Sequence, residues 1–455
     1  MPISDNVTAV NAVLKFLYKS GVPNATYNKQ ALLSKMKVSS DFTGEKKVLA
    51  IQYTNPQGFG SSFDRAYLHA SSAEQYSRWQ LFRVQHYGFA RVDGEVMRTA
   101  VDPGALVNVW KNRTQSVVRG MHNSAGRLIY GAGTGKIGAP NAAATVSTST
   151  ITLSVPADVA NFERGMFITM YTADSFGASY IKLDDGSVVT SAPADADRVR
   201  YISAVSRDIA SGTATLTLAA YTESNTSGGS VTYPATAQWP AGAIIVRDGD
   251  GITYSSGSTS YDTNAKSPAG IEQWISGNQI GTAPYGDTLF GLNRSTDKLR
   301  LGGQSLDATG LNMVEALQTL EANILFQGIG YPDTIVVNPI DLGNLKKSAL
   351  SDVIRIPAQD PKQNLNFQEV QFIGQNGPIS FVSDPFCPKG KAYMLKMDTW
   401  ALHTAPGGMF QLVDWDGVNY LRLTNADTYE ARFASYYQLG CDNPGANGYV
   451  YNWGA

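Results

Sequence analysis

The chain has 455 residues, enough for two or three structural units with hydrophobic cores of their own. Charged residues make up only 16% of it, against about a quarter in a typical soluble protein. The formal net charge of −2 excludes a general electrostatic attraction to nucleic acid or to an anionic membrane. A weakly charged surface suits a protein that covers much of itself with copies or partners, and it also suits an ordinary β-rich enzyme.

The two cysteines, Cys387 and Cys441, are fewer than a secreted chain of this size usually carries, which favours folding in a reducing compartment. The first residues lack the basic, apolar and small-residue regions of a signal peptide. No apolar stretch approaches the roughly 18 residues that a membrane span needs. We therefore expect a protein made in the cytosol, with no membrane contact.

Residues 1–45 predict two short helices and loops without an obvious core. The first helix ends at Gly21, and its apolar face consists of Val7, Val10, Leu14 and Leu17. The second is expected from Asn28 to Val38, with an apolar side made of Leu32, Leu33 and Met36. Such a segment is typical of an arm that packs on something else.

Residues 46–92 predict an extended β-hairpin. Two runs rich in β-branched and aromatic residues, "KVLAIQYTN" and "SRWQLFRVQHYGFAR", flank a weakly apolar tip that contains Pro56 and several glycines and serines. A two-stranded hairpin cannot bury both of its faces alone. It must lie on its own domain or on a neighbour.

A long helix follows, with Asp102 as its cap, Pro103 at its first position and an end near Ser124. Its apolar residues recur at about helical spacing and are Leu106, Val109, Trp110, Val117 and Met121. After it comes the glycine-rich run "YGAGTGKIG", residues 130–138.

This run does not match a phosphate-binding loop. Tyr130 stands where the first glycine of such a loop belongs, and Ile137 stands where its magnesium-binding hydroxyl belongs. No helix follows whose N-terminus could hold the anion. We therefore interpret the run as a turn that leaves a helix, with Lys136 solvated.

Residues 140–261 predict a separate all-β unit, a small barrel or sandwich, because short alternating runs are separated by Gly, Ser, Asp and Pro. A hairpin turn is expected at Asp185-Gly186.

From about Gly270 helix and strand alternate again: "ATGLNMVEALQTLEANI" predicts a helix, and "YPDTIVVNPIDLGNLKKSAL" predicts a buried strand, a turn and a helix. Further strands are expected at "EVQFIG", "PISFVSD", "KAYMLKM", "MFQLVDW", "NYLRLT" and "YEARFASYYQLG".

No pattern for catalysis or metal binding stands out. The four histidines, His69, His86, His122 and His403, are scattered, and no nucleophile-elbow pattern is present. The acidic runs "RDGDG" (247–251) and "VDWDG" (413–417) do not continue into a full calcium loop, and Asp-Gly is first a turn signal. We expect no enzymatic activity, no cofactor and no metal.

The hairpin region combines arginines with aromatic residues. This pattern fits a protein–protein contact, in which Arg, Trp and Tyr are favoured anchors, and it also fits single-stranded nucleic acid. The near-neutral charge favours the protein contact. The candidate contact residues are Arg65, Tyr76, Arg78, Trp79, Phe82, Arg83 and Tyr87.

The order of these parts resembles the major capsid proteins of tailed phages with the HK97 fold. "YGAGTGKIGAP" is similar to the family's G-x-G-T-G after its spine helix, and "PDTIVVNPIDLGNLKKSAL" is similar to its strand, turn and helix with a VxNP turn. "GPISFVSDPFCPKGKAYMLKMDTWALH" and "YEARFASYYQLG" resemble later strands of the family. The resemblance covers roughly two-thirds of the chain, and each motif alone is weak.

The resemblance implies an α+β, HK97-like fold with an N-arm (1–45), an E-loop (46–92), a first P-domain part with the spine helix (93–139), an A-domain (262–410) and returning P-domain strands (411–455). Residues 140–261 would be an inserted β domain. The implied function is an icosahedral virion shell of hexamers and pentamers, assembled in the host cytoplasm around DNA that is contacted non-specifically.

The implied partners are copies of the chain, a separate scaffolding protein, a portal and, in some members, a decoration protein. No lysine lies between Val48 and Trp110, so the hairpin lacks the donor of the isopeptide bond that some members form, and we expect a non-covalent shell. Two alternatives remain: an encapsulin-like nanocompartment shell of the same fold, and a β-rich enzyme or carbohydrate-binding protein centred on residues 140–261.

Overall fold

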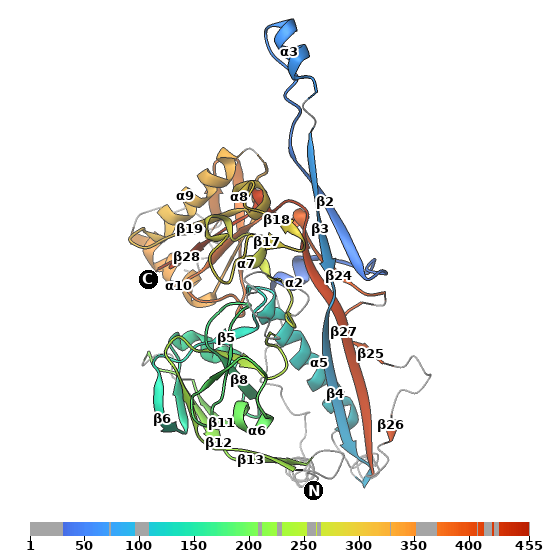
Figure 1. Cartoon of the computed structure of the whole chain (residues 1–455). Coiled ribbons are helices and arrows are strands. Elements are labelled where there is room, and N and C mark those ends of the chain that lie inside the picture. The colour runs from blue at the N-terminus through green and yellow to red at the C-terminus, as the bar shows by residue number, and fades with distance from the viewer. Residues whose placement is uncertain are drawn as a thin grey trace, which may run out of the picture.

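The computed structural model describes residues 31–71, 74–95, 109–207, 212–224, 230–252, 261, 265–327, 329–351, 371–406, 408–413, 421–422 and 427–454. The fold mixes helices and strands, as expected. Figure 1 shows a long two-stranded ribbon with a projecting hairpin, a β-rich region beside its lower part and a region of helices on a sheet beside its middle. In the described part of the chain, no helix is both long and apolar enough to cross a membrane.

In the N-terminal part of the described chain, the helix predicted to reach Val38 ends earlier, and its predicted start at Asn28 lies outside the described residues. Helix α2 spans Ala31–Lys35, and β1 (Lys37–Ser39) follows it and pairs in parallel with β24 (Trp400–Thr404). Val38 therefore lies in a strand, opposite Leu402, which suits its β-branched side chain. Leu32 and Met36 are buried in the main core. The predicted helix that ends at Gly21 lies outside the described residues.

The predicted hairpin divides between two sheets. Strand β2 (Lys46–Thr54) pairs with β3 (Gln75–Phe82), whereas β4 (Val84–Asp93) pairs along its whole length with β27 (Thr428–Cys441). The run "SRWQLFRVQHYGFAR" was predicted as one continuous strand, and this is wrong. Odd-numbered residues are buried up to Leu81, whereas even-numbered residues are buried from Val84 onward. Leu81 and Val84 are both buried three residues apart, so a continuous strand would expose one of the two sets. The chain changes sheets at Arg83.

The returning strand β27 is the central strand of the sheet that contains β4. It also pairs with β24 and with the short strands β25 (Gln411–Leu412) and β26 (Leu421–Arg422). Helix α5 (Val109–Leu128) crosses β4, and there Gly88 leaves room for Val117 and Met121, since a Cβ on Gly88 would lie 2.4 Å from the Met121 sulfur. The helix continues past Ser124, and its predicted start at Asp102 lies outside the described residues.

The glycine-rich run after α5 is a turn that enters a strand, as predicted. Gly133 and Gly135 have φ angles of +90° and +80°, a left-handed backbone that favours glycine. Strand β5 (Lys136–Gly138) then pairs with β16. Lys136 is not simply solvated, because its Nζ lies 3.1 Å from Asp174 Oδ2. Burial opposes its charge, but the Asp174 carboxylate raises the pKa of Lys136 above its ordinary value.

Residues 136–247 are β-rich. Their strands are β5, β6 (Ala144–Thr148), β7 (Thr150–Thr152), β8 (Phe167–Tyr171), β9 (Tyr180–Ile181), β10 (Val188–Val189), β11 (Arg200–Ser206), β12 (Thr215–Ala219), β13 (Tyr221–Ser224), β14 (Ser230–Tyr233), β15 (Ala237–Trp239) and β16 (Ile244–Arg247). Eight of them form one sheet in which β10, β9, β8, β11, β12 and β7 follow in order and β16 pairs with β8 and β5. The predicted hairpin turn at Asp185-Gly186 joins β9 to β10. A 3-10 turn (Pro156–Asn161) and α6 (Asp195–Arg198) complete the region.

Strand β16 lies between two hydrophobic cores. Ile245 points into a core formed by the β-rich region alone, whereas Ile244 and Val246 belong to the main core of the molecule. A strand that is buried on both faces reads as a continuous apolar run, which explains "AIIV" in the sequence. The β-rich region therefore has its own core and is packed on the rest of the chain.

The remaining region is a six-stranded sheet with helices. The sheet order is β19 (Gln304–Asp307), β28 (Gly448–Tyr451), β23 (Ala392–Leu395), β20 (Thr334–Val337), β22 (Gly377–Ser383) and β21 (Gln371–Gly374). The helices are α7 (Ile271–Trp274), α8 (Lys298–Gly302), α9 (Met313–Phe326) and α10 (Pro339–Ser351), and β17 (Thr288–Leu289) pairs with β18 (Leu292–Asn293). Short 3-10 turns span Gly277–Gln279, Met397–Thr399 and Pro444–Ala446.

Two details of this region bear on the predictions. The turn at Asn338-Pro339 opens α10, and the Asn338 Oδ1 accepts a hydrogen bond from the Ile340 N–H at 3.0 Å. The resemblance implies that the whole of 411–455 belongs to the returning strands, whereas β28 within this range pairs with β19 and β23 in the six-stranded sheet. The end of the described chain therefore closes this sheet and does not continue the long ribbon.

Replacing Gly135 with alanine tests the turn after α5. The Gly135→Ala variant should lose about 3 kcal/mol of unfolding free energy, because its Cβ would lie 2.4 Å from the Asp250 carbonyl oxygen in a left-handed backbone. Gly165→Ala is the matched control, with a φ of +91° and nothing within 4 Å, and should lose about 1 kcal/mol. Urea unfolding measures both. Equal losses would contradict the close approach.

Candidate interaction surface

The base of the hairpin is fixed by aromatic contacts inside the chain. Trp79 of β3 is fully buried and meets Trp274 edge-on at a centroid distance of 5.3 Å. Phe82 stacks on Tyr261 at 5.4 Å and contacts Phe290 edge-on at 5.3 Å. The Gln80 N–H also donates to the Phe290 carbonyl at 2.9 Å. These contacts hold the first few residue pairs of the hairpin against the body.

A second set of hydrogen bonds connects this base to β27. Gln438 is fully buried, and its Nε2 donates to the Phe82 carbonyl and to the Tyr261 hydroxyl, both at 3.1 Å. Its Oε1 accepts from the Ala269 N–H at 3.0 Å. The Gln438 amide therefore links the hairpin, the long ribbon and the loop before α7.

Beyond its base, the hairpin is held by its own ladder and by Arg300, whose Nη1 donates to the Tyr53 carbonyl at 2.7 Å. Gln52 pairs with Tyr76 and Ala50 with Arg78, and Tyr76 is 64% exposed. Figure 1 shows the tip beyond β2 and β3 standing away from the body, with α3 at the far end. A two-stranded hairpin is marginal in water on its own. The exposed side of β3 and the tip beyond Thr54 are thus available to a surface that lies outside this chain.

The tip carries a short helix that the sequence did not predict. Helix α3 spans Phe63–His69, and the loop passes back closely enough that a Cβ on Gly58 would lie 2.7 Å from the Ala70 Cα. Phe63 and Tyr67, one turn apart, stack with centroids 6.3 Å apart. The stacking and the close return give the tip a defined shape.

This tip exposes large apolar side chains, which we call the tip patch. It consists of Phe59 (70% exposed), Phe63 (82%), Tyr67 (73%) and Leu68 (63%). Single exposed apolar residues are ordinary on a protein surface, but four large ones within ten residues, two of them stacked on each other, are typical of an interaction site. Arg65 is exposed on the same helix and adds a polar rim.

The ribbon of β4 and β27 has a second exposed aromatic face. Tyr87 and Phe89 point away from helix α5, and each is about half exposed (48% and 51%). The Tyr87 hydroxyl lies 3.5 Å from that of Tyr436, and this hydrogen bond raises the pKa of Tyr87 to about 12. Farther along, Arg91 Nε donates to Glu430 Oε2 at 2.6 Å across the two strands. Tyr87 is therefore uncharged at neutral pH, while the exposed Arg432 lies opposite Phe89 in the ladder.

The structure separates the seven candidate contact residues into two groups. Four of them are exposed and available to a partner: Arg65, Tyr76, Arg78 and Tyr87. Trp79 is fully buried within the chain, and its side chain is therefore not available to a partner in this conformation. Phe82 is held by Tyr261 and Phe290, and the Arg83 guanidinium lies 5.2 Å from the Phe42 ring centroid and donates to the Phe42 carbonyl at 3.2 Å.

Sequence reasoning missed the tip patch and Phe89. In the sequence, glycines and serines surround Phe59 and Phe63, and this composition indicates a weakly apolar tip. The i, i+4 spacing of Phe63 and Tyr67 places these two on one side of a helical turn, which is the signal that was available. Phe89 lies among alternating residues of β4, but the face that it occupies depends on the pairing with β27.

The other candidate chemistry gives no assembled site in the described residues. No group of three or more His, Cys, Asp or Glu side chains in that part of the chain is placed to hold a metal. Burial raises the thiol pKa of both Cys387 and Cys441, which leaves neither as a thiolate at neutral pH. His86 and His122 each contact the Phe410 ring, with centroid distances of 6.3 Å and 4.2 Å. Of the two acidic runs, residues 414–417 lie outside the described part.

The comparisons with known proteins give similarities of structure only. No protein-family model matches the sequence, and no curated protein matches it significantly. The structure is similar to the capsid asymmetric unit of cyanophage A-1(L), at 10% identity and a TM-score of 0.47 over 98% of this chain and 99% of that one. It is similar to a structure of Mycobacterium phage Adephagia, at 10% identity and a TM-score of 0.41 over 96% and 95% of the two chains. It is also similar to the SrpI encapsulin of Synechococcus elongatus PCC 7942, at 7% identity and a TM-score of 0.43 over 97% and 94%.

Two alanine substitutions three residues apart test the division between base and outer hairpin. Trp79→Ala should lower the free energy of unfolding by about 3–5 kcal/mol, because it empties a fully buried site against Trp274. Tyr76→Ala should change it by less than about 0.5 kcal/mol, because that side chain faces solvent. Denaturant unfolding of the unassembled chain measures both. A large loss for Tyr76→Ala would show that the outer hairpin packs within the chain.

Proposed function

We propose that this chain is a major capsid protein of a tailed phage, a structural subunit that assembles with copies of itself into an icosahedral shell around the genome. The observation that carries the proposal is the tip patch, which the chain holds at the end of a narrow hairpin, far from any core of its own. In a monomer these four large apolar side chains are exposed to water, which is energetically unfavourable. They are stabilised when another subunit covers them.

We assign the parts of the structure to the roles that the sequence resemblance implies. Strands β2 and β3 with α3 would be the E-loop, and α5 with β4 and β27 would be the P-domain with its spine helix. The six-stranded sheet and its helices would be the A-domain, which would meet its copies at the centre of hexamers and pentamers. Residues 136–247 would be the inserted domain, with a boundary four residues before the predicted one at 140, since β5 already belongs to its sheet.

The mechanism is repeated self-association without chemistry. The tip patch and the exposed aromatic face at Tyr87 and Phe89 would be covered by neighbouring subunits, with Arg65 and Arg78 at the rim. Contact with packaged DNA would use scattered charges and would not be sequence-specific. A scaffolding protein, a portal and a decoration protein are the further partners that the resemblance implies, and the virion is the implied location.

Removing the aromatic stack from the tip tests the proposal. The double variant Phe63→Ser/Tyr67→Ser should keep the unfolding free energy of the wild type within about 1 kcal/mol, since both residues are exposed. It should, however, form few or no closed particles by electron microscopy and sedimentation. Val146→Ser removes an apolar side chain that is 74% exposed in the β-rich region and should assemble normally.

Three results would contradict the proposal. A wild-type chain that stays monodisperse and monomeric would favour the β-rich enzyme or binding protein. Normal assembly of the tip variant would remove the tip patch from the mechanism. Natural particles that contain an enzyme and no nucleic acid would favour a nanocompartment shell.

The lysines of the hairpin predict a shell without covalent links. Only Lys46 and Lys47 lie in strand β2, at its base, and Lys47 is paired there with Asp41. The outer hairpin has no lysine that could reach a neighbour's asparagine. Purified particles boiled in SDS should therefore give only the 48.9 kDa monomer on a denaturing gel. A ladder of higher bands under reducing conditions would contradict this.

A further inference from the structure

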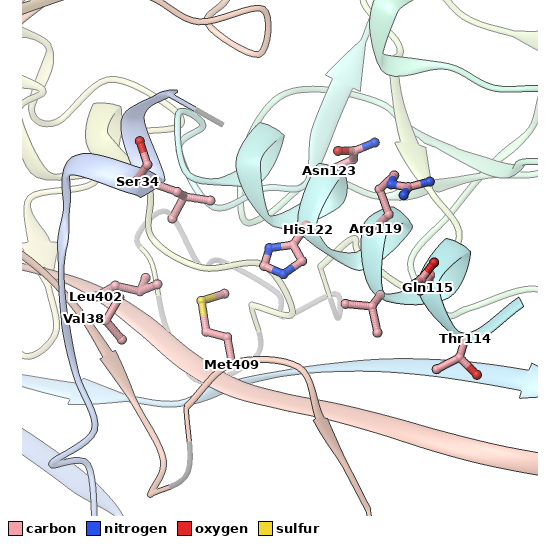
Figure 2. A pocket seen from close by; sticks show the side chains of 11 residues that line it. Ser34, Val38, Thr114, Gln115, Arg119, His122, Asn123, Leu402 and Met409 are labelled. Carbon is pink, nitrogen blue, oxygen red and sulfur yellow. The ribbon is translucent and has the colours of Figure 1, made fainter. Parts of the chain in front are cut away.

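An open groove of about 720 Å³ lies between the beginning of the described chain, helix α5 and strand β24 (Figure 2). Figure 2 shows Val38, Leu402 and Met409 on one side of it and the side chains of α5 on the other. The lining residues are Leu33, Ser34, Val38, Thr114, Gln115, Val118, Arg119, His122, Asn123, Leu402 and Met409.

The groove has an apolar floor and a polar rim. Leu33, Val118 and Met409 are only partly covered, and Val38 is 53% exposed although it lies in a paired strand. Gln115 and Arg119 stand along the α5 edge. Apolar side chains between polar edges form the kind of surface in which an amphipathic helix buries its apolar face.

The sequence predicts a helix of this kind shortly before the groove-lining residues Leu33 and Ser34. Helix α2 begins at Ala31, and Leu33 and Ser34 already line the groove. The sequence before it predicts an amphipathic helix over 4–21, and the intervening residues 22–30 span at most about 30 Å. A segment tethered this closely has a high effective concentration at the groove.

The lengths also agree. The groove runs along α5 from Thr114 to Asn123, a rise of about 14 Å. From Val7 to Leu17 the apolar face of the predicted helix rises about 15 Å. A single helix of this length is marginal in water and needs a surface to pack on. We propose that residues 4–21 dock their apolar face into the groove of the same molecule and extend the core over helix α5.

Paired cysteines test this directly in the full-length chain. Val10→Cys and Leu14→Cys, each combined with Val118→Cys, place thiols on the apolar face and in the groove. Under mild oxidation at least one pair should form a bond within the chain, seen as a faster band on a non-reducing gel. The native thiols of Cys387 and Cys441 are buried and do not compete.

The matched control combines Ala12→Cys with Val118→Cys, because position 12 lies on the opposite face of the predicted helix. It should stay reduced. A band at twice the monomer mass, in place of the faster band, would assign the groove to the segment of a neighbouring copy and overturn docking within the molecule. Equal cross-linking of the control and the apolar-face variants would overturn a defined docked face.

A second measurement does not depend on thiol geometry. Amide hydrogen exchange over residues 4–21 should be slowed at least about tenfold in the wild type relative to Val38→Asp, which places a charge in the groove at an exposed position. Equal exchange in the two proteins would overturn the proposal. The inference does not rest on shell assembly, since both measurements can be made on the unassembled chain.

Discussion

The structure depends on the aromatic cluster at the base of the hairpin. Phe82 of the hairpin, Tyr261 after the β-rich region and Phe290 of the sheet-and-helix region meet with centroid distances of 5.2–5.4 Å. Phe176 of the β-rich region contacts Tyr261 edge-on at 5.6 Å. Residues far apart in the sequence thus share one core, and the direction in which the hairpin leaves the body is fixed there.

The two ends of the hairpin therefore have different roles: the base packs within the chain, and the tip is exposed. At the base, Trp79 and Phe82 pack against aromatic side chains of the same chain. Gln438 donates hydrogen bonds there to the Phe82 carbonyl and to the Tyr261 hydroxyl. At the tip, Phe63 and Tyr67 contact each other and little else. A firmly held base therefore presents an apolar tip at a defined place. A subunit that must meet its neighbours in a repeated geometry needs both properties.

Much of the local structure could be predicted from the sequence, because strands and helices carry their own periodic patterns. The runs at residues 200–206 and 215–219, and the capped helix that begins after Asn312, needed no knowledge of the rest of the chain. The failures come from pairing over long distances. Whether β28 joins the ribbon or the six-stranded sheet depends on partners more than a hundred residues away at β19.

The candidate surface shows the same limit. Trp79 and Tyr76 lie in one strand with similar chemistry, yet one is buried and the other is exposed. Only the position of Trp274, almost two hundred residues later, decides which face of the strand is covered. The apolar residues Leu81 and Val84 are three positions apart, which interrupts the alternation of the strand at Arg83. The pairing of β4 with β27 explains this interruption, and that pairing depends on residues far along the chain.

The central claim is that the tip patch is covered by another copy of the chain. Hydroxyl-radical labelling of the aromatic side chains, read by mass spectrometry in assembled particles and in the dissociated subunit, measures this most directly. The account predicts that Phe63 and Tyr67 are labelled strongly in the subunit and are protected several-fold in the particle, while Phe42, buried in both states, stays weakly labelled. Equal labelling of Phe63 and Tyr67 in the particle and in the subunit would contradict it.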